Sequence, residues 1–283
     1  MDFELSSGYS EALSFAKSHY ENFPVISFLL PTEFKNHIAI IYWYARTADD
    51  IVDEGKFSQQ ERIKKLDEFR HRFESIINGK CINDLEYCLL NTIKEKKLTV
   101  QYFFDLLIAF KQDVIKHRYG NFDELINYCK HSANPVGRLI LELFGYREEK
   151  LNIQSDKICT ALQITNFLQD TLNDFDKGRI YLPQDEIMRF GVDEKMFELN
   201  ENNLNLKRLI QFNVERAQLM FDDGRGLLQS LNGGLKIEIS WTINGGERIL
   251  DKIRKNDFNI LNKRLSLNKF DFASIFLRSL ISQ

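Results

Sequence analysis

Four aspartates stand at helical spacing where carboxylates are costly, and together they favour a site for divalent cations. Asp49 and Asp53 end one expected helix, and Asp170 and Asp174 lie near the end of another. Carbonyl groups already concentrate negative potential at a helix C-terminus, and carboxylates four residues apart repel each other. A bound cation relieves both costs. Magnesium fits, because it takes one or two carboxylates together with phosphate oxygens of a substrate.

The first expected helix carries one polar stripe on an otherwise apolar surface. Residues 38–52 are apolar nearly all round, which is typical of a buried helix. Four polar residues nevertheless recur at steps of four, three and four, within about 60° of one another: Tyr42, Arg46, Asp49 and Asp53. Because buried charges need partners or metals, this stripe is predicted to face a cavity.

A second helix, expected over residues 160–174, repeats the arrangement. Its polar residues follow at steps of three, four and four, within about 80°: Gln163, Asn166, Asp170 and Asp174. Facing helices with four inward carboxylates are predicted to hold two or three magnesium ions. Arg46 and Arg179 would complement the phosphates of a substrate, since guanidinium groups offer bidentate donors.

Composition favours an all-α protein that does not bind nucleic acid. Only four prolines and 14 glycines interrupt 283 residues, and no linker rich in proline, glycine or serine divides them. We therefore expect one domain over residues 1–283, built from about a dozen helices. The net charge of −3 leaves no basic excess for phosphate backbones. Charges interrupt every apolar run before about 18 residues, so we expect no membrane-spanning helix. The four cysteines show no paired spacing and are interpreted as reduced thiols, so we expect a cytoplasmic protein.

Segments in matching order, from about residue 10 to 270, resemble the squalene/phytoene synthase family. Residues 19–55 (HYENFPVISFLLP to HIAIIYWYARTADDIVDEG) resemble the opening of the family, and residues 161–183 (ALQITNFLQDTLNDFDKGRIYLP) resemble its second aspartate-rich signature. The match continues through YCKHSANPVG at 128–137 and GGERILDKIRKNDFNILNKRL at 245–265. HYENFPV, SANPVGRL and the glycine pair before ERILDKI are similar to bacterial members of the hopanoid pathway that convert presqualene diphosphate to hydroxysqualene.

The resemblance implies the all-α isoprenoid synthase fold, with helices around a central active-site cavity. It also implies an isoprenyl diphosphate substrate and magnesium held by the four aspartates. Positions that contact the diphosphate or its metal shell in the family correspond to His19, Arg46, Gln163, Asn166 and Arg179, and the polar stripe adds Tyr42. Tyr128 is implied to act in catalysis with Gln163 and Asn166. A phosphate-binding arginine near the C-terminus corresponds to Arg264, with the adjacent Lys263 as the alternative.

Gly246 stands where many family members carry a tyrosine that is expected to touch the first diphosphate. Its absence favours an enzyme that ionises presqualene diphosphate, rearranges the cation and quenches it with water to hydroxysqualene. One alternative is a full head-to-head synthase that condenses two farnesyl or geranylgeranyl diphosphates to squalene, dehydrosqualene or phytoene. Another is a catalytically inactive relative that acts as an assembly or scaffold protein, against which the presence of all four aspartates argues.

Two further expectations concern partners and one structural pair. The product implied by the resemblance is a lipid. We therefore expect a peripheral membrane contact and functional coupling to the enzymes before and after this one in squalene synthesis. Asp113 and Arg118 lie a little over one helical turn apart and are expected to form a structural ion pair.

Overall fold

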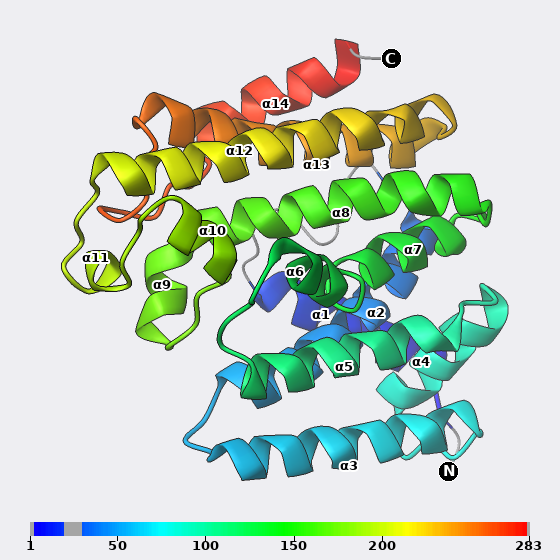
Figure 1. The fold of residues 1–283 in the computed structure, drawn as a ribbon. Helices are drawn as coiled ribbons and strands as arrows, with labels where there is room; N and C mark the ends of the chain where they lie inside the picture. Colours follow the sequence, from blue (N-terminus) through cyan, green and yellow to red (C-terminus); the bar gives the residue numbers. More distant parts are fainter. Residues whose placement is uncertain (1–2, 20–29, 282–283) are drawn as a thin grey trace. The chain divides into compact units, whose positions relative to one another are not determined.

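The computed structural model describes residues 3–19 and 30–281, and these fold into helices (Figure 1). Within these ranges there is no strand, and a single isolated bridge joins Arg118 and Ile180. The all-α class predicted from the sequence is therefore confirmed. No helix in the same ranges is long and apolar enough to cross a membrane.

The order of the helices along the chain, with their bounds, is as follows. In order they are α1 (Leu5–Ser18), α2 (Thr32–Asp53), α3 (Gln59–Ile77), α4 (Asp84–Glu95), α5 (Val100–Ile115), α6 (Phe122–Cys129), α7 (Asn134–Leu143), α8 (Glu149–Gln169), α9 (Thr171–Asp176), α10 (Gln184–Arg189), α11 (Lys195–Glu198), α12 (Leu204–Gly224), the 3-10 helix η1 (Arg225–Gln229), α13 (Gly233–Lys255) and α14 (Lys269–Ile281).

Contacts within the chain divide it into two compact units. The first unit comprises residues 1–115 and 135–152, and so contains α1 to α5 and nearly all of α7. The second unit comprises residues 116–134 and 153–283, with α6, most of α8 and the later helices. The single domain expected over residues 1–283 stays a prediction.

Helix α2 is the central helix of the first unit, because α1, α3, α4 and α5 all pack against it. Contact on so many sides explains why its sequence is apolar nearly all round. Ala39, Ile40 and Ala48 are fully buried. The polar stripe of α2 is therefore held on a helix whose other sides are fixed by packing.

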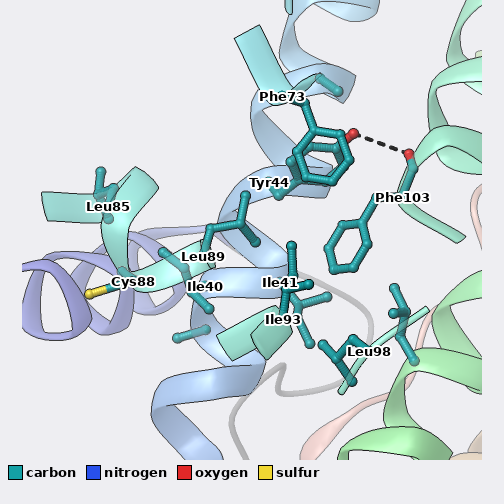
Figure 2. Close-up of a cluster of buried hydrophobic side chains, with 14 of the residues drawn as sticks. Ile40, Ile41, Tyr44, Phe73, Leu85, Cys88, Leu89, Ile93, Leu98 and Phe103 are labelled. Atoms are coloured by element: carbon teal, nitrogen blue, oxygen red, sulfur yellow. Dashed lines mark hydrogen bonds between the residues drawn. The ribbon is translucent and has the colours of Figure 1, made fainter. Parts of the chain in front are cut away.

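An aromatic cluster anchors α2 on the side opposite its polar stripe (Figure 2). The Tyr44 ring lies 4.8 Å from the Phe73 ring of α3 and 5.1 Å from the Phe103 ring of α5. The Tyr44 hydroxyl donates a hydrogen bond to the Phe103 carbonyl oxygen at 3.1 Å, so its burial leaves no unpaired donor. This cluster fixes the rotation of α2 about its own axis.

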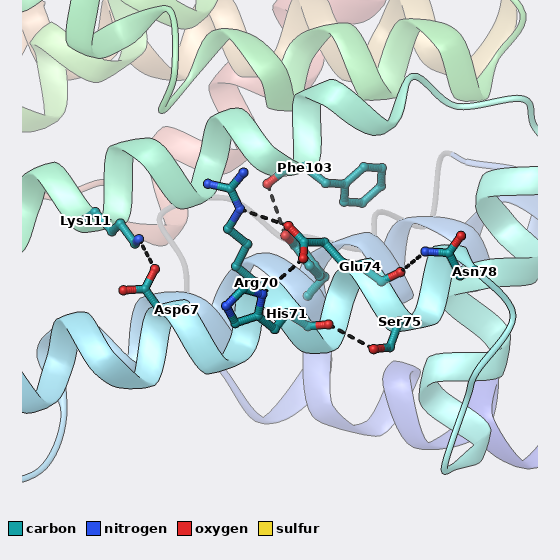
Figure 3. A network of polar contacts seen from close by, with 9 residues as sticks. Asp67, Arg70, His71, Glu74, Ser75, Asn78, Phe103 and Lys111 are labelled. Carbon is teal, nitrogen blue, oxygen red and sulfur yellow. Dashed lines mark hydrogen bonds and ion pairs between the residues drawn. The ribbon is translucent and has the colours of Figure 1, made fainter.

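Polar contacts on α3 add to this packing at the surface of the first unit (Figure 3). An ion pair between Asp67 and Lys111 joins α3 to α5. Arg70 and His71 both reach Glu74, at 3.2 Å and 3.1 Å. Exposed pairs of this kind contribute at most about 1 kcal/mol each, so apolar packing, and not surface charge, holds α2 in place.

In the second unit α13 packs against both α12 and α14 (Figure 1). The buried carboxylate of Asp271 fastens α14 to α13, accepting hydrogen bonds from Arg248 Nε at 2.7 Å and the Asn268 amide at 2.8 Å and pairing with Lys252 Nζ at 2.6 Å. Burial alone would raise the pKa of Asp271, but these donors outweigh it and hold the pKa at about 2. The segment between the two helices is thus held at both ends.

Candidate active site

The C-terminal end of α2 gathers charge around one guanidinium. Arg46 reaches three carboxylates, at 3.2 Å to Asp49, 2.7 Å to Asp50 and 3.6 Å to Glu54. The last turn of α2 contains no basic residue, although a helix C-terminus favours cations. Arg46 therefore pairs with three carboxylates at a helix C-terminus, where the backbone carbonyls disfavour negative charge further.

The pKa of Asp49 reflects this excess of negative charge. Burial, followed by the charge of Asp53, raises the pKa of Asp49 to about 6, while Arg46 works in the opposite direction. Asp113 on α5 adds to the rise. A divalent cation would lower the free energy of the ionised form, and carboxylate oxygens are the donors that magnesium prefers.

Asp113 is a residue of this site that the sequence interpretation missed. Arg118 donates hydrogen bonds to Glu194, at 2.9 Å and 2.8 Å through two nitrogens, and its expected ion pair with Asp113 stays a prediction. Asp113 is itself buried and acts on the charge of Asp49. A carboxylate among the apolar residues of α5 was a signal that Asp113 could belong to a site. The cation of Arg118, five residues away, offered a simpler explanation for it.

His19 lies directly after α1, beside the polar stripe. Its Nδ1 lies 2.8 Å from the Phe15 carbonyl oxygen, and its ring centroid lies 6.3 Å from that of Tyr42. Because a carbonyl only accepts hydrogen bonds, Nδ1 carries a proton, and Nε2 of the neutral ring is the nitrogen that can accept a hydrogen bond. The structure therefore brings His19, Tyr42, Arg46, Asp49 and Asp53 together in the first unit. Residues 20–29, which include most of HYENFPV, lie outside the described residues.

The second aspartate pair lies at a break between two helices. The uninterrupted helix expected over residues 160–174 is wrong, since α8 ends at Gln169 and α9 begins at Thr171. The Thr171 hydroxyl bonds the carbonyl oxygens of Phe167 and Leu168, at 2.8 Å and 3.3 Å, and such side-chain bonds bend helices. The Asp174 amide still bonds the Asp170 carbonyl at 2.8 Å, so the two carboxylates keep their one-turn relation.

A glycine turn then sets Arg179 beside Asp174. Gly178 has a φ of +77°, a backbone conformation that disfavours other residues. Its amide bonds the Phe175 carbonyl at 2.8 Å, and the Arg179 amide bonds the Asp174 carbonyl at 2.8 Å, which is the pattern of a Schellman helix end. Burial, then the charges of Arg179 and Arg118, lower the pKa of His117, as a positive potential that attracts anions would do.

Arg264 reaches the same carboxylate region from the segment between α13 and α14. Its Nε pairs with Asp170 Oδ1, and its Nη2 lies 3.0 Å from Asp170 Oδ2. Arg264, which is predicted to bind the diphosphate, thus contacts both carboxylate oxygens of Asp170, which is predicted to bind the metal. This contact supports Arg264 over the neighbouring Lys263 as the phosphate-binding residue. No sequence pattern indicates this pairing, because the two residues are 94 positions apart.

Tyr128 belongs to a buried aromatic cluster of the second unit. Its ring centroid lies 5.6 Å from that of Tyr119, 5.9 Å from Tyr181 and 6.0 Å from Phe167. Phe167 and Tyr181 stack at 3.8 Å with nearly parallel planes. Ring faces attract cationic carbon as they attract ammonium groups, so this cluster has the chemistry to stabilise a carbocation.

The second unit also contains the two amides predicted to act in the site. Gln163 and Asn166 lie half-buried on α8, one turn or more before Asp170. The carboxylate pairs of the two units remain separate predictions for one metal site. Among the described residues no group of three or more His, Cys, Asp or Glu side chains is placed to hold a metal ion by itself. The oxygen donors that are present fit magnesium, which takes few protein ligands and completes its shell with water and phosphate.

Gly246 lies where α13 approaches its neighbours within the second unit. A Cβ atom built there would come within 2.5 Å of Phe221 Cζ and 3.0 Å of Leu162 Cδ2. Phe221 is fully buried, so its ring has no exposed position to which it could move. Even a methyl group here would force its neighbours to shift, and a tyrosine side chain has no room at position 246.

Comparison with known proteins agrees with these features. Residues 16–271 match the squalene/phytoene synthase family. Hydroxysqualene synthases of Sinorhizobium fredii and Rhodopseudomonas palustris are 30% and 32% identical, over 84% and 89% of this chain and 80% and 85% of their own. A crystal structure of a squalene synthase from Alicyclobacillus acidocaldarius is 32% identical, with a TM-score of 0.85 over 90% of this chain and 96% of that one.

More distant relatives show the same fold. A dehydrosqualene synthase crystallised with a ligand has a TM-score of 0.88 at 20% identity, covering 98% of this chain and 97% of its own. The isoprenoid synthase fold expected from the sequence is therefore confirmed. This chain belongs to the squalene/phytoene synthase family of enzymes.

Proposed function

We propose that this protein is a magnesium-dependent synthase that converts presqualene diphosphate and water to hydroxysqualene and diphosphate. The observation that carries the proposal is the likeness to two enzymes named hydroxysqualene synthase, which extends over 84% and 89% of the chain. Gly246 supports it, because the packing of Phe221 leaves no space for a side chain at that position.

The proposed reaction balances without a reductant. The carbon–oxygen bond of presqualene diphosphate breaks, and the diphosphate leaves with the electron pair. The cyclopropylcarbinyl cation that remains rearranges to an allylic cation. The oxygen of a water molecule then forms the new carbon–oxygen bond and loses a proton, which gives the tertiary alcohol.

The residues of the chain would bind the leaving group and protect the cation. Magnesium, when bound, supplies positive charge that lowers the barrier to departure of the diphosphate. Asp49, Asp53, Asp170 and Asp174 would hold it. Cationic and polar side chains would orient the diphosphate, since preorganised donors aimed at developing charge lower the barrier most: His19, Tyr42, Arg46, Arg179 and Arg264.

Side chains of the second unit would act on the carbon skeleton. Tyr128 would stabilise the cation through its ring face or assist ionisation through its hydroxyl. Gln163 and Asn166 would complete the metal shell and position the attacking water. The tight packing of the cluster around Tyr128 supports this role, because exclusion of bulk water prevents early capture of the cation.

A full head-to-head synthase is the second candidate. Phytoene synthase 2 of Solanum lycopersicum is 27% identical over 94% of this chain and 87% of its own length, and the squalene synthase structure is 32% identical. Such an enzyme would condense two farnesyl or geranylgeranyl diphosphates before the rearrangement. Many family members are expected to contact the first diphosphate through a tyrosine at position 246, and this chain has a glycine there.

Product analysis separates the candidates. Purified protein is incubated with magnesium and either presqualene diphosphate or farnesyl diphosphate, and the products are identified by mass spectrometry. We expect hydroxysqualene from presqualene diphosphate, no consumption of farnesyl diphosphate and no turnover with excess EDTA. Consumption of farnesyl diphosphate would support the head-to-head synthase, whereas no turnover of either one or of geranylgeranyl diphosphate would favour an inactive assembly protein.

The proposed product is a lipid, so we further infer a peripheral contact with membranes and coupling to the enzymes before and after it in squalene synthesis. Sedimentation of the protein with phospholipid vesicles, with and without bound substrate, measures the first. Absence of the protein from the vesicle pellet under both conditions would contradict it.

A further inference from the structure

We propose that Arg264 is an exchangeable counterion of Asp170, which it neutralises in the metal-free protein and leaves when a divalent cation and a diphosphate bind. The inference rests on the proposed function, because it assumes that Asp170 holds the cation. It adds that Arg264 occupies the Asp170 carboxylate in the resting enzyme. Arg264 would therefore oppose the binding of a metal ion alone, and it would favour the binding of a metal ion together with diphosphate.

The geometry of the pair makes the two cations competitors. Arg264 engages both carboxylate oxygens of Asp170, through Nε and through Nη2 at 3.0 Å. A divalent cation on either oxygen would stand within a few ångströms of the guanidinium, and like charges at such distances repel. The side chains of Arg264 and Asp170 are 38% and 25% exposed, so solvent screens this repulsion only in part.

The backbone on the C-terminal side of Arg264 is held in place, so a rotation of its side chain accounts for the exchange. Gln169 Nε2 donates to the Leu265 carbonyl at 2.5 Å, and Lys252 Nζ donates to the Ser266 carbonyl at 2.9 Å. Asp271 accepts from the Asn268 amide at 2.8 Å. Three successive contacts within four residues thus keep the Arg264 backbone next to Asp170 in either state.

A guanidinium group is suited to both partners. Its fork of donors matches the two oxygens of a carboxylate and equally the oxygens of a phosphate. When a diphosphate arrives with the cation, Arg264 can exchange a carboxylate for a more highly charged anion at little cost in hydrogen bonds. An arginine with only a structural role, as a link between residues 256–268 and Asp170, would not be expected to bind a diphosphate as well.

The proposal predicts effects of opposite sign for one substitution. Removing the charge in Arg264→Gln should tighten binding of a divalent cation in the absence of diphosphate, because the competitor is gone. A partly exposed ion pair limits the gain to about three- to fivefold. The same variant should weaken binding of inorganic diphosphate at saturating magnesium by at least about tenfold, because a charged hydrogen-bond pair is lost.

The test measures Mn²⁺ binding by electron paramagnetic resonance without diphosphate, and inorganic diphosphate binding by calorimetry at saturating Mg²⁺. Lys255→Gln is the matched control, because it removes one charge from the exposed end of α13, and it should leave both affinities unchanged. Arg264→Lys keeps the charge but loses the fork, and should fall between wild type and Arg264→Gln. Thermal unfolding verifies that each variant is folded.

The outcomes separate the two proposals. If the wild type binds diphosphate with magnesium but Arg264→Gln binds Mn²⁺ no more tightly than the wild type, the exchange is refuted and the proposed function stands. Equal tightening in Lys255→Gln would also refute it, since general electrostatics would then suffice. If the wild type does not bind diphosphate in the presence of magnesium, the proposed function itself fails.

Discussion

Replacing Gly246 with alanine should destabilise the protein despite the higher helix propensity of alanine. The new Cβ would lie 2.5 Å from Phe221 Cζ, about 1 Å closer than carbon atoms normally approach. Overpacking of a core costs about 1–3 kcal/mol, and replacing a helical glycine by alanine returns about 1 kcal/mol. The net expectation is a loss of about 1 kcal/mol in the free energy of unfolding, measured by urea denaturation.

A double-mutant cycle with Phe221→Leu tests the cause of this loss. Leucine has no atom at the position of Cζ, so in its presence Gly246→Ala should become neutral or slightly stabilising. The two substitutions should therefore couple by about 1–2 kcal/mol, whereas independent sites add to within about 0.5 kcal/mol. Equal effects of Gly246→Ala in both backgrounds would refute the close packing inferred for this position.

Three further predictions follow from the structure. Asp271→Asn should lower stability at pH 7 by about 2 kcal/mol, because the folded pKa of about 2 lies below the ordinary 3.8. The contribution of Asp271 is present above pH 3.8 and is lost as the pH falls toward 2, so wild type and variant should converge in acid; a constant difference would contradict this. Gly178→Ala should cost about 1 kcal/mol and weaken diphosphate binding through Arg179, since its φ is +77°; unchanged urea denaturation and calorimetry would count against the turn. Asp53→Asn should reduce turnover by at least about 100-fold, because it removes a metal contact. Glu68→Gln, on the exposed side of α3, is the control and should leave turnover unchanged. Equal activity of the two variants would exclude Asp53 as a ligand.

The core of the first unit and the polar stripe of α2 could be predicted because they depend on local periodicity. Helix α2 is apolar on every side but one, and four helices indeed pack around it. The spacing of Tyr42, Arg46, Asp49 and Asp53 determines their common face for any straight helix. The resemblance of the same segments to the squalene/phytoene synthase family also predicted the fold.

Features that depend on tertiary contact could not be read from spacing. The break at Asp170 has no clear local signal, because the hydroxyls of Thr47, Thr165 and Thr242 bond the carbonyl four residues back, as Thr171 does, within continuous helices. Arg118 has Glu194 as its partner, 76 residues away, and Arg264 has Asp170, 94 residues away. Long side chains choose among many carboxylates in the folded chain, and sequence separation carries no information about that choice.

The central claim is that water quenches a cation formed from presqualene diphosphate. The most direct measurement is turnover of presqualene diphosphate with magnesium in ¹⁸O-labelled water, followed by mass spectrometry of the alcohol. The account predicts hydroxysqualene that carries one ¹⁸O atom in its hydroxyl group. A hydrocarbon product, or an alcohol without the label, would contradict it.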